Sequence, residues 1–423
     1  MIKGLFDLKN ILCTLFILLS IYLLSNINLN TSILDPLDGA LKDFELTDLV
    51  FSQMRHSQHA TDSTFVVSET QADTNVVIVN IGKLTRGGIA DELNEISKYN
   101  PKVIGIDAFF RHPKDSIEDL ALQQAIKNAH NVVLVSKLSQ YNETTQQFDS
   151  IEHSNPMFSD YSDFAFANLI TESDEREGKT SRTFNPVSTV KNKDYLCFPL
   201  KIAEYYNPSA VKKILDRKKD VEVINFRGNL AKYHVLDIDD VFDPEVDKSF
   251  LRGKIVLMGF VGESIHESSW EDMFYSPLNH KYVGKAYPDI YGIVIHANII
   301  SMTLAHDFID ESPSWLTYLF SIILCHLNVV VFHYFLKRHG IWYGVVTKGL
   351  QLLQSVILII VILVIFDKMN YKLELSLAFA VIVLAGDLVE IWFDGVMNFD
   401  WKKMFNKLLI KTRITNITNI NNK

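Results

Sequence analysis

Four long and predominantly apolar runs constrain this chain more than any other feature. They cover residues 11–29, 315–336, 344–366 and 373–393. About 20 apolar residues span the hydrocarbon core of a bilayer, so each run predicts a transmembrane helix. A cleaved signal peptide is the competing interpretation of the first run. Asn26, Asn28 and Asn30 stand where small residues of a cleavage site would be expected, which favours an uncleaved anchor.

The basic residues near these runs predict the orientation of the chain in the membrane. They gather before the first run, between the second and third runs, and in the tail after the fourth run. With four crossings, all three groups fall on one side, and the positive-inside rule makes that side cytoplasmic. We therefore expect residues 1–10 and the basic tail 394–423 in the cytoplasm, and residues 30–313 outside it.

The composition of the outer region excludes several classes of protein. Residues 30–313 contain 28 basic and 43 acidic side chains, a net charge of about −15. Such an acidic domain argues against a nucleic-acid partner. Cys197 is the single cysteine of this region, so an internal disulfide framework is excluded. His56 and His59 have helical spacing without a third ligand at a recognisable interval, and we expect no metal site there.

Within the outer region, apolar strand-like runs alternate with amphipathic helical stretches, which predicts an α/β domain with a mostly parallel sheet covered by helices. The expected strands are residues 76–81, 103–106, 132–138, 221–226 and 254–259. The expected helices are residues 89–99, 117–129, 198–206 and 293–304. Residues 140–193 are polar and predict loops with short antiparallel strands.

Several sequence blocks resemble those of a known family in the same order. They are LTDLVFSQMR, VVIVNIG, KYNPKVIGIDAFF, DLALQQAIKNAHNVVLVSK, FPLKIAEYY, INFRG, LRGKIVLMG and GIVIHANIISMTL. In this order, and flanked by membrane helices, they resemble the type-two CHASE domain, a sensory domain associated with bacterial cyclases and histidine kinases. The sequence departs from the family pattern at Asn80, where an acid is common.

The resemblance implies a bacterial inner-membrane (plasma-membrane) sensor that detects a small-molecule or protein signal, without an enzymatic activity or cofactor of its own. Family members commonly continue into a catalytic domain, whereas about 30 residues follow the last apolar run here. We therefore expect the signal to pass to a separate cytoplasmic or membrane output protein. A homodimer is also compatible with the sequence. The alternatives are a structural anchor or assembly factor of the envelope and an envelope enzyme, although no hydrolase, phosphate-binding or zinc-protease motif supports an enzyme.

Candidate ligand-binding residues follow the predicted strands, because ligands of open parallel sheets bind at the carboxyl ends of the strands. Asp107 ends one strand, and His266 and Asp272 lie in the loop after another. We expect Asp107 and Asp272 to line one pocket. His296 and Arg182 are further candidates, although a lone histidine in an apolar helix is more often a core residue and an arginine among acids is often solvated.

Polar residues inside the predicted membrane helices are costly, so they predict a functional network. The candidates are Asn328, His333, Lys348, Gln351, Asp387 and Glu390. Depth along each helix predicts that Lys348 pairs with Glu390 and that Asn328 or Gln351 bonds Asp387, all facing the bundle interior. Independent snorkelling of Lys348 and Glu390 to the headgroups is the alternative.

Overall fold

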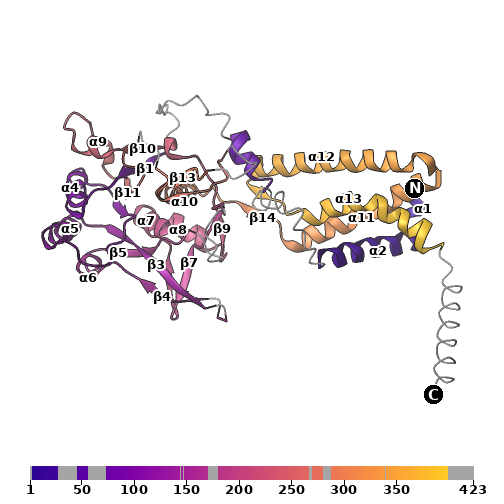
Figure 1. The fold of residues 1–423 in the computed structure, drawn as a ribbon, viewed down its shortest axis with the longest axis horizontal. Helices are drawn as coiled ribbons and strands as arrows, with labels where there is room; N and C mark the ends of the chain where they lie inside the picture. Colours follow the sequence, from indigo (N-terminus) through magenta and orange to yellow (C-terminus); the bar gives the residue numbers. More distant parts are fainter. Residues whose placement is uncertain are drawn as a thin grey trace, which may run out of the picture. The chain divides into compact units, whose positions relative to one another are not determined.

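The computed structural model describes residues 2–26, 45–55, 73–142, 144–145, 147–169, 180–265, 269–279, 287–338 and 340–398. These residues form two compact units (Figure 1). The sheet unit consists of the described residues within 33–310 and 366–371. The helical unit belongs to residues 1–32, 311–365 and 372–423.

A mixed sheet with a parallel centre forms the core of the sheet unit. In spatial order its parallel strands are β10 (Tyr233–Leu236), β1 (Asp73–Asn80), β11 (Ile255–Gly259), β2 (Val103–Ile106) and β3 (Val132–Asn142), and β5 (Asp163–Phe166) also pairs with β3. Every residue of β2 and of β11 is buried. Continuous apolar strands of this kind require helices on both faces of the sheet.

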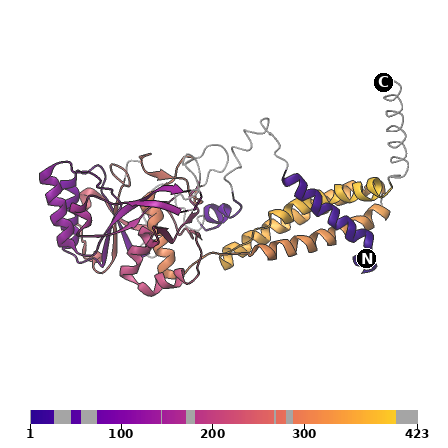
Figure 2. The same cartoon turned by 90° about the horizontal axis from the view of Figure 1, so that it is seen from below.

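Side chains alternate between the two faces of the sheet, and each face packs against a different set of helices. One face packs against α4 (Arg86–Ser97) and α5 (Ser116–Ala129), whose apolar side chains share a core with Ile104 and Ile106. The other face packs against α7 (Phe198–Tyr206) and α10 (Gly292–Ala305), and α8 (Pro208–Leu215) packs against these two helices (Figure 2). A Cβ atom at Gly105 would lie 2.3 Å from Cδ1 of Ile202 in α7, so a larger residue here would require the side chains of α7 to shift.

Short strands complete the sheet unit where the sequence is polar. The sheet continues from β3 through β4 (Gln147–Glu152), β7 (Val187–Val190) and β8 (Lys193–Leu196). Separate two-stranded pairs are β6 (Thr183–Phe184) with β9 (Glu222–Val223) and β12 (Met273–Phe274) with β13 (Ile290–Tyr291). The α/β fold expected from the sequence is thus confirmed. The strand expected at residues 221–226 is shorter than predicted, because only Glu222–Val223 is extended, and it pairs with β6 outside the main sheet.

Among its described residues, the helical unit contains four helices that are long and apolar enough to cross a membrane. They are α2 (Leu8–Ser25), α11 (Ser314–Arg338), α12 (Tyr343–Met369) and α13 (Ser376–Glu390), the last continued by a π-helical turn to Val396. Cys13, Ile17, Cys325, Val329 and Val381 form part of a core shared by α2, α11 and α13. The four apolar helices expected from the sequence are confirmed.

Candidate functional site

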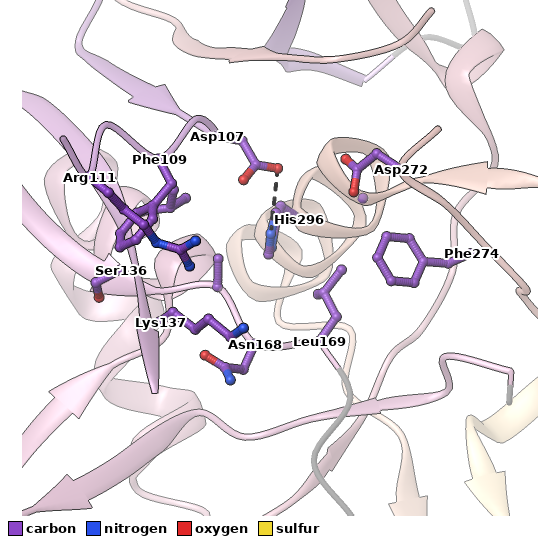
Figure 3. A pocket seen from close by; sticks show the side chains of 13 residues that line it. Asp107, Phe109, Arg111, Ser136, Lys137, Asn168, Leu169, Asp272, Phe274 and His296 are labelled. Carbon is purple, nitrogen blue, oxygen red and sulfur yellow. Dashed lines mark ion pairs between the residues drawn. The ribbon is translucent and has the colours of Figure 1, made fainter. Parts of the chain in front are cut away.

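A cavity of about 260 Å³ lies at the carboxyl ends of β2 and β5 and beside the middle of β3, next to the first turns of α10 (Figure 3). Asp107 follows β2 directly, and Ala167 follows β5. Lys137 of β3 stands next to Ser136, which pairs with the last residue of β5. The cavity therefore occupies the position where parallel sheets bind ligands, because strand ends and loops converge there.

Asp107 is held on the cavity wall by the backbone of the sheet. Its amide N–H donates a hydrogen bond of 2.8 Å to the carbonyl of Met258 in β11. Its side chain is 18% exposed. Burial raises the pKa of Asp107 to about 7, and the nearby carboxylate of Asp272 adds to this increase. Asp107 therefore changes its charge close to neutral pH.

Asp272 reaches the same cavity from the loop that precedes β12. Its backbone has a φ of 54°, in the left-handed region that asparagine and aspartate tolerate better than most residues. A Cβ atom on Gly292 would lie 3.2 Å from the Asp272 carboxylate, so the glycine leaves room for it at the start of α10. Asp272 as a whole residue is exposed, but its carboxylate is partly buried. This burial raises the pKa of Asp272 to about 6.

His296 lies one turn into α10 and faces Asp107 across the cavity (Figure 3). Its Nε2 atom is 3.9 Å from Oδ2 of Asp107, beyond hydrogen-bonding distance. The edge of its ring packs against Phe198, and its side chain is 2% exposed. Burial lowers the pKa of His296 to about 3, so the ring is neutral. Nδ1 has no hydrogen-bond partner among the described residues.

Two basic side chains point into the cavity from a different wall, as Figure 3 shows. Arg111 lies over the ring of Phe109 at 4.4 Å, and its Nε atom is 3.3 Å from a carboxylate oxygen of Glu152. Lys137 extends from β3. Sequence reasoning missed both residues, although Lys137 lies near the end of the predicted strand 132–138 and Arg111 lies five residues after the predicted strand 103–106.

Phe109, Leu169 and Phe274 form the apolar part of the wall. Within the described ranges, no group of three His, Cys, Asp or Glu side chains is placed to hold a metal ion. The cavity can therefore bind a small molecule through two carboxylates and two basic groups.

Arg182, another candidate from the sequence, does not line this cavity. Both carboxylate oxygens of Asp48 accept hydrogen bonds from Arg182, at 3.0 Å from Nε and 2.7 Å from Nη2. The Arg182 side chain is 13% exposed, so it is neither a solvated arginine nor a wall of the cavity. Its role here is structural, because a buried carboxylate requires such a partner. His266 lies outside the described residues.

Two of the predicted membrane residues join α11 to other helices. Nδ1 of His333 lies 2.6 Å from Oδ1 of Asn10 in α2. Asn328 accepts a hydrogen bond of 2.8 Å from Gln354 of α12, and the predicted bond between Asn328 and Asp387 is wrong. His326 of the same helix is also polar but was not placed in the predicted network, and its Nδ1 lies 2.9 Å from Oγ1 of Thr14 in α2. Its signal was the same as that of His333, a histidine in an apolar run.

The predicted pairing of Lys348 with Glu390 is also wrong. Lys348 binds both carboxylate oxygens of Asp387, at 2.9 and 2.7 Å, and both side chains are 56% exposed on the helical unit alone. Gln351 donates to the carbonyls of Ile382 and Val383 and so fixes the antiparallel register of α12 and α13. This register places Lys348 level with Asp387, and Glu390 is exposed one turn further along.

Comparisons with known proteins agree with the fold and with the sequence blocks. The family model of the CHASE2 domain matches residues 14–332, which is most of the chain. No curated protein and no solved structure matched. CHASE2 domains are extracellular sensory domains rather than catalytic ones. Because the match extends from the first apolar helix through residues 33–310 of the sheet unit into α11, the chain belongs to the CHASE2 domain family.

Proposed function

We propose that this chain is an extracytoplasmic sensor of the bacterial inner membrane that binds its signal in the cavity beside Asp107. The observation that carries this proposal is the cavity itself. It lies at the carboxyl ends of parallel strands, and neither Asp107 nor Asp272 pairs with a lysine or arginine among the described residues. A partly buried carboxylate with a raised pKa in a cleft supports a binding role.

The sheet unit also contains a physical connection to a membrane helix. The last residues of α12 belong to the sheet unit together with the segment up to Tyr371. Arg55 holds this segment, because it donates hydrogen bonds to the carbonyl of Phe366 at 3.2 Å and to the side chain of Asn370 at 2.7 Å. It also donates to Asn225 at 2.9 Å. A ligand that prefers one arrangement of the sheet unit can thus act on α12.

We further propose that the helical unit passes the signal to a separate membrane protein, with both termini of the chain in the cytoplasm. Lys348 and Asp387 support this proposal, because their ion pair lies on the surface of α12 and α13. Charged side chains within membrane segments usually face protein or water. A partner helix over this pair would shield it from lipid.

Photo-crosslinking in native membranes tests the whole proposal. A photoreactive residue replaces Val383, which is 55% exposed one turn before Asp387, and in the control it replaces Leu15, which is 59% exposed on α2. We expect a specific crosslinked partner from position 383 and none from position 15. The substitution Asp107→Ala should change the yield, and Arg55→Gln should abolish that dependence. Equal, unspecific yields at both positions would contradict the output route. A specific partner whose yield ignores Asp107 would instead favour an anchor.

A further inference from the structure

The charged side chains of the cavity are separated into an acidic wall and a basic wall. Figure 3 shows Asp107 and Asp272 on one side, and Arg111 and Lys137 pointing in from another. Arg111 has its own carboxylate partner in Glu152 and forms no ion pair with the acidic wall. A ligand that carries one positive and one negative group would therefore meet an opposite charge at each end.

The acidic wall fits an ammonium group better than a metal ion. An ammonium has three hydrogen-bond donors, and the wall offers the two carboxylates and the neutral ring of His296 as acceptors. His296 is 2% exposed and faces Asp107 with Nε2, at 3.9 Å from Oδ2, which leaves room for a small group between them. A divalent ion would require more ligands than these side chains supply, and no three described acidic, histidine or cysteine side chains are placed for one.

The basic wall fits a carboxylate. The Arg111 guanidinium lies 4.4 Å from the ring centroid of Phe109, its Nε atom lies 3.3 Å from Glu152, and Figure 3 shows the side chain pointing into the cavity. Such a guanidinium binds a planar carboxylate with two parallel hydrogen bonds. The amine of Lys137 adds a second positive charge on the same wall.

The volume and the remaining lining limit the size of the ligand. Cavities for drug-sized ligands measure about 300 to 1,000 Å³, and this cavity of about 260 Å³ lies below that range. Leu169 and Phe274 offer a short apolar wall between the charged ends.

We propose, resting on the sensor function above, that the cavity binds a small zwitterion of the amino-acid class. Its ammonium group lies between Asp107 and Asp272, and its carboxylate lies against Arg111 and Lys137.

Thermal unfolding of the full-length chain in detergent tests this proposal. The probes are the standard L-amino acids and, for each, its N-acetyl derivative and its methyl ester. They are added at millimolar concentration at a pH above the pKa values of both acids. We expect at least one free amino acid to raise the melting temperature. Removing either charge of that probe should weaken its binding about 10- to 100-fold, because each charge-assisted hydrogen bond is lost.

Substitutions assign each end of the probe to its wall. Asp107→Asn should weaken binding of the free amino acid and of its methyl ester, because both keep the ammonium. Arg111→Gln should weaken the free amino acid and leave the ester unchanged. The matched controls are Asp91→Asn in α4 and Arg252→Gln before β11, both exposed and distant in sequence from the cavity walls, and neither should change binding.

Three outcomes would overturn the inference. The first is that no amino acid stabilises the chain, and the second is that the acetylated or esterified probe binds as well as its parent. The third is that the wall variants bind the free amino acid like the unchanged chain. None of these results decides the sensor function, because the crosslinking from position 383 and its dependence on Asp107 are measured without any added probe.

Discussion

Two regions of the sheet unit bury carboxylates, and the pKa of the carboxylate shifts in opposite directions in the two regions. Between α4 and α5, Asp119 is 2% exposed and accepts hydrogen bonds from Arg86 and from the backbone N–H of Lys114. Burial opposes the ionisation of Asp119, but these hydrogen bonds outweigh it and lower its pKa. At the cavity, Asp107 is 18% exposed without a basic partner among the described residues, and its pKa is raised to about 7.

This difference distinguishes carboxylates that stabilise the fold from carboxylates that are available to bind a ligand. A buried carboxylate that serves stability is paired, because an unpaired charge in the interior is strongly destabilising. Glu92 of α4 shows that lack of a partner is not sufficient to mark a site. It is fully buried without a hydrogen-bond partner among the described residues, and burial, with a contribution from Asp237, raises its pKa to about 8. Unlike Asp107, Glu92 does not line the cavity.

The largest expected effect comes from breaking the paired region. Arg86→Met leaves the Asp119 carboxylate buried and unpaired, and it also removes the hydrogen bond of 2.7 Å from Arg86 to the His112 carbonyl. We expect the free energy of unfolding of the full-length chain in detergent to fall by about 3 to 5 kcal/mol. Denaturant unfolding followed by tryptophan fluorescence measures it.

The control for this prediction is Arg252→Met, which changes an exposed arginine without an ion pair to a described residue. Its effect should stay within about 0.5 kcal/mol. A loss of less than about 1 kcal/mol for Arg86→Met would show that the pair does not hold α4 on α5.

A smaller and pH-dependent effect comes from removing the unpaired charge. The pKa of Asp107 is about 7 in the folded state and 3.8 in the reference state. Between these values the folded state holds the proton that the unfolded state has released, so stability falls as pH rises from about 4 to 7. Asp107→Asn should remove this loss. Relative to the unchanged chain, it should gain stability progressively up to pH 7, by at most about 4 kcal/mol, and gain little at pH 4.

Melting temperatures measured across this pH range test the expectation. Asp272 and the neutral His296 remain beside position 107, with Arg111 and Lys137 on the other wall, so part of the pH dependence persists in the variant. Glu92→Gln is the matched control, because its raised pKa gives a pH dependence of the same sign without a side chain in the cavity. If the gain of Asp107→Asn is the same at pH 4 and pH 8, the carboxyl group does not titrate as the comparison requires.

The sequence predicted the parallel sheet because its central strands are continuous β-branched runs, which have few alternative structures. It also predicted that Asp107 and Asp272 approach each other, because strand ends of a parallel sheet meet at one edge. It could not predict β10, since Tyr233–Leu236 is short and contains a polar histidine. The ion pair of Arg182 could not be predicted either, because its partner Asp48 lies more than 130 positions away in the sequence.

The membrane residues illustrate a second limit of sequence reasoning. Depth along each helix predicted Glu390 as the partner of Lys348, whereas Lys348 binds Asp387 one turn away. The choice between these two acids depends on the register of α12 against α13, which the hydrogen bonds of Gln351 fix. Registers between helices follow from packing, and packing cannot be read from one helix at a time.

The smallest expected effect on stability comes from a third kind of charged group, the exposed ion pair of Lys348 and Asp387. Both side chains are 56% exposed, and exposed ion pairs contribute at most about 1 kcal/mol. The double variant Lys348→Met with Asp387→Leu leaves no unpaired charge, so the unfolding free energy of the chain in detergent should change by less than about 1 kcal/mol. Lys348→Met alone should be more destabilising than the double variant, because it leaves Asp387 without its partner. The crosslink from position 383 should disappear in the double variant if the pair recognises an output protein. If the double variant destabilises the chain by several kcal/mol, then this pair stabilises the fold as the pair of Arg86 and Asp119 does.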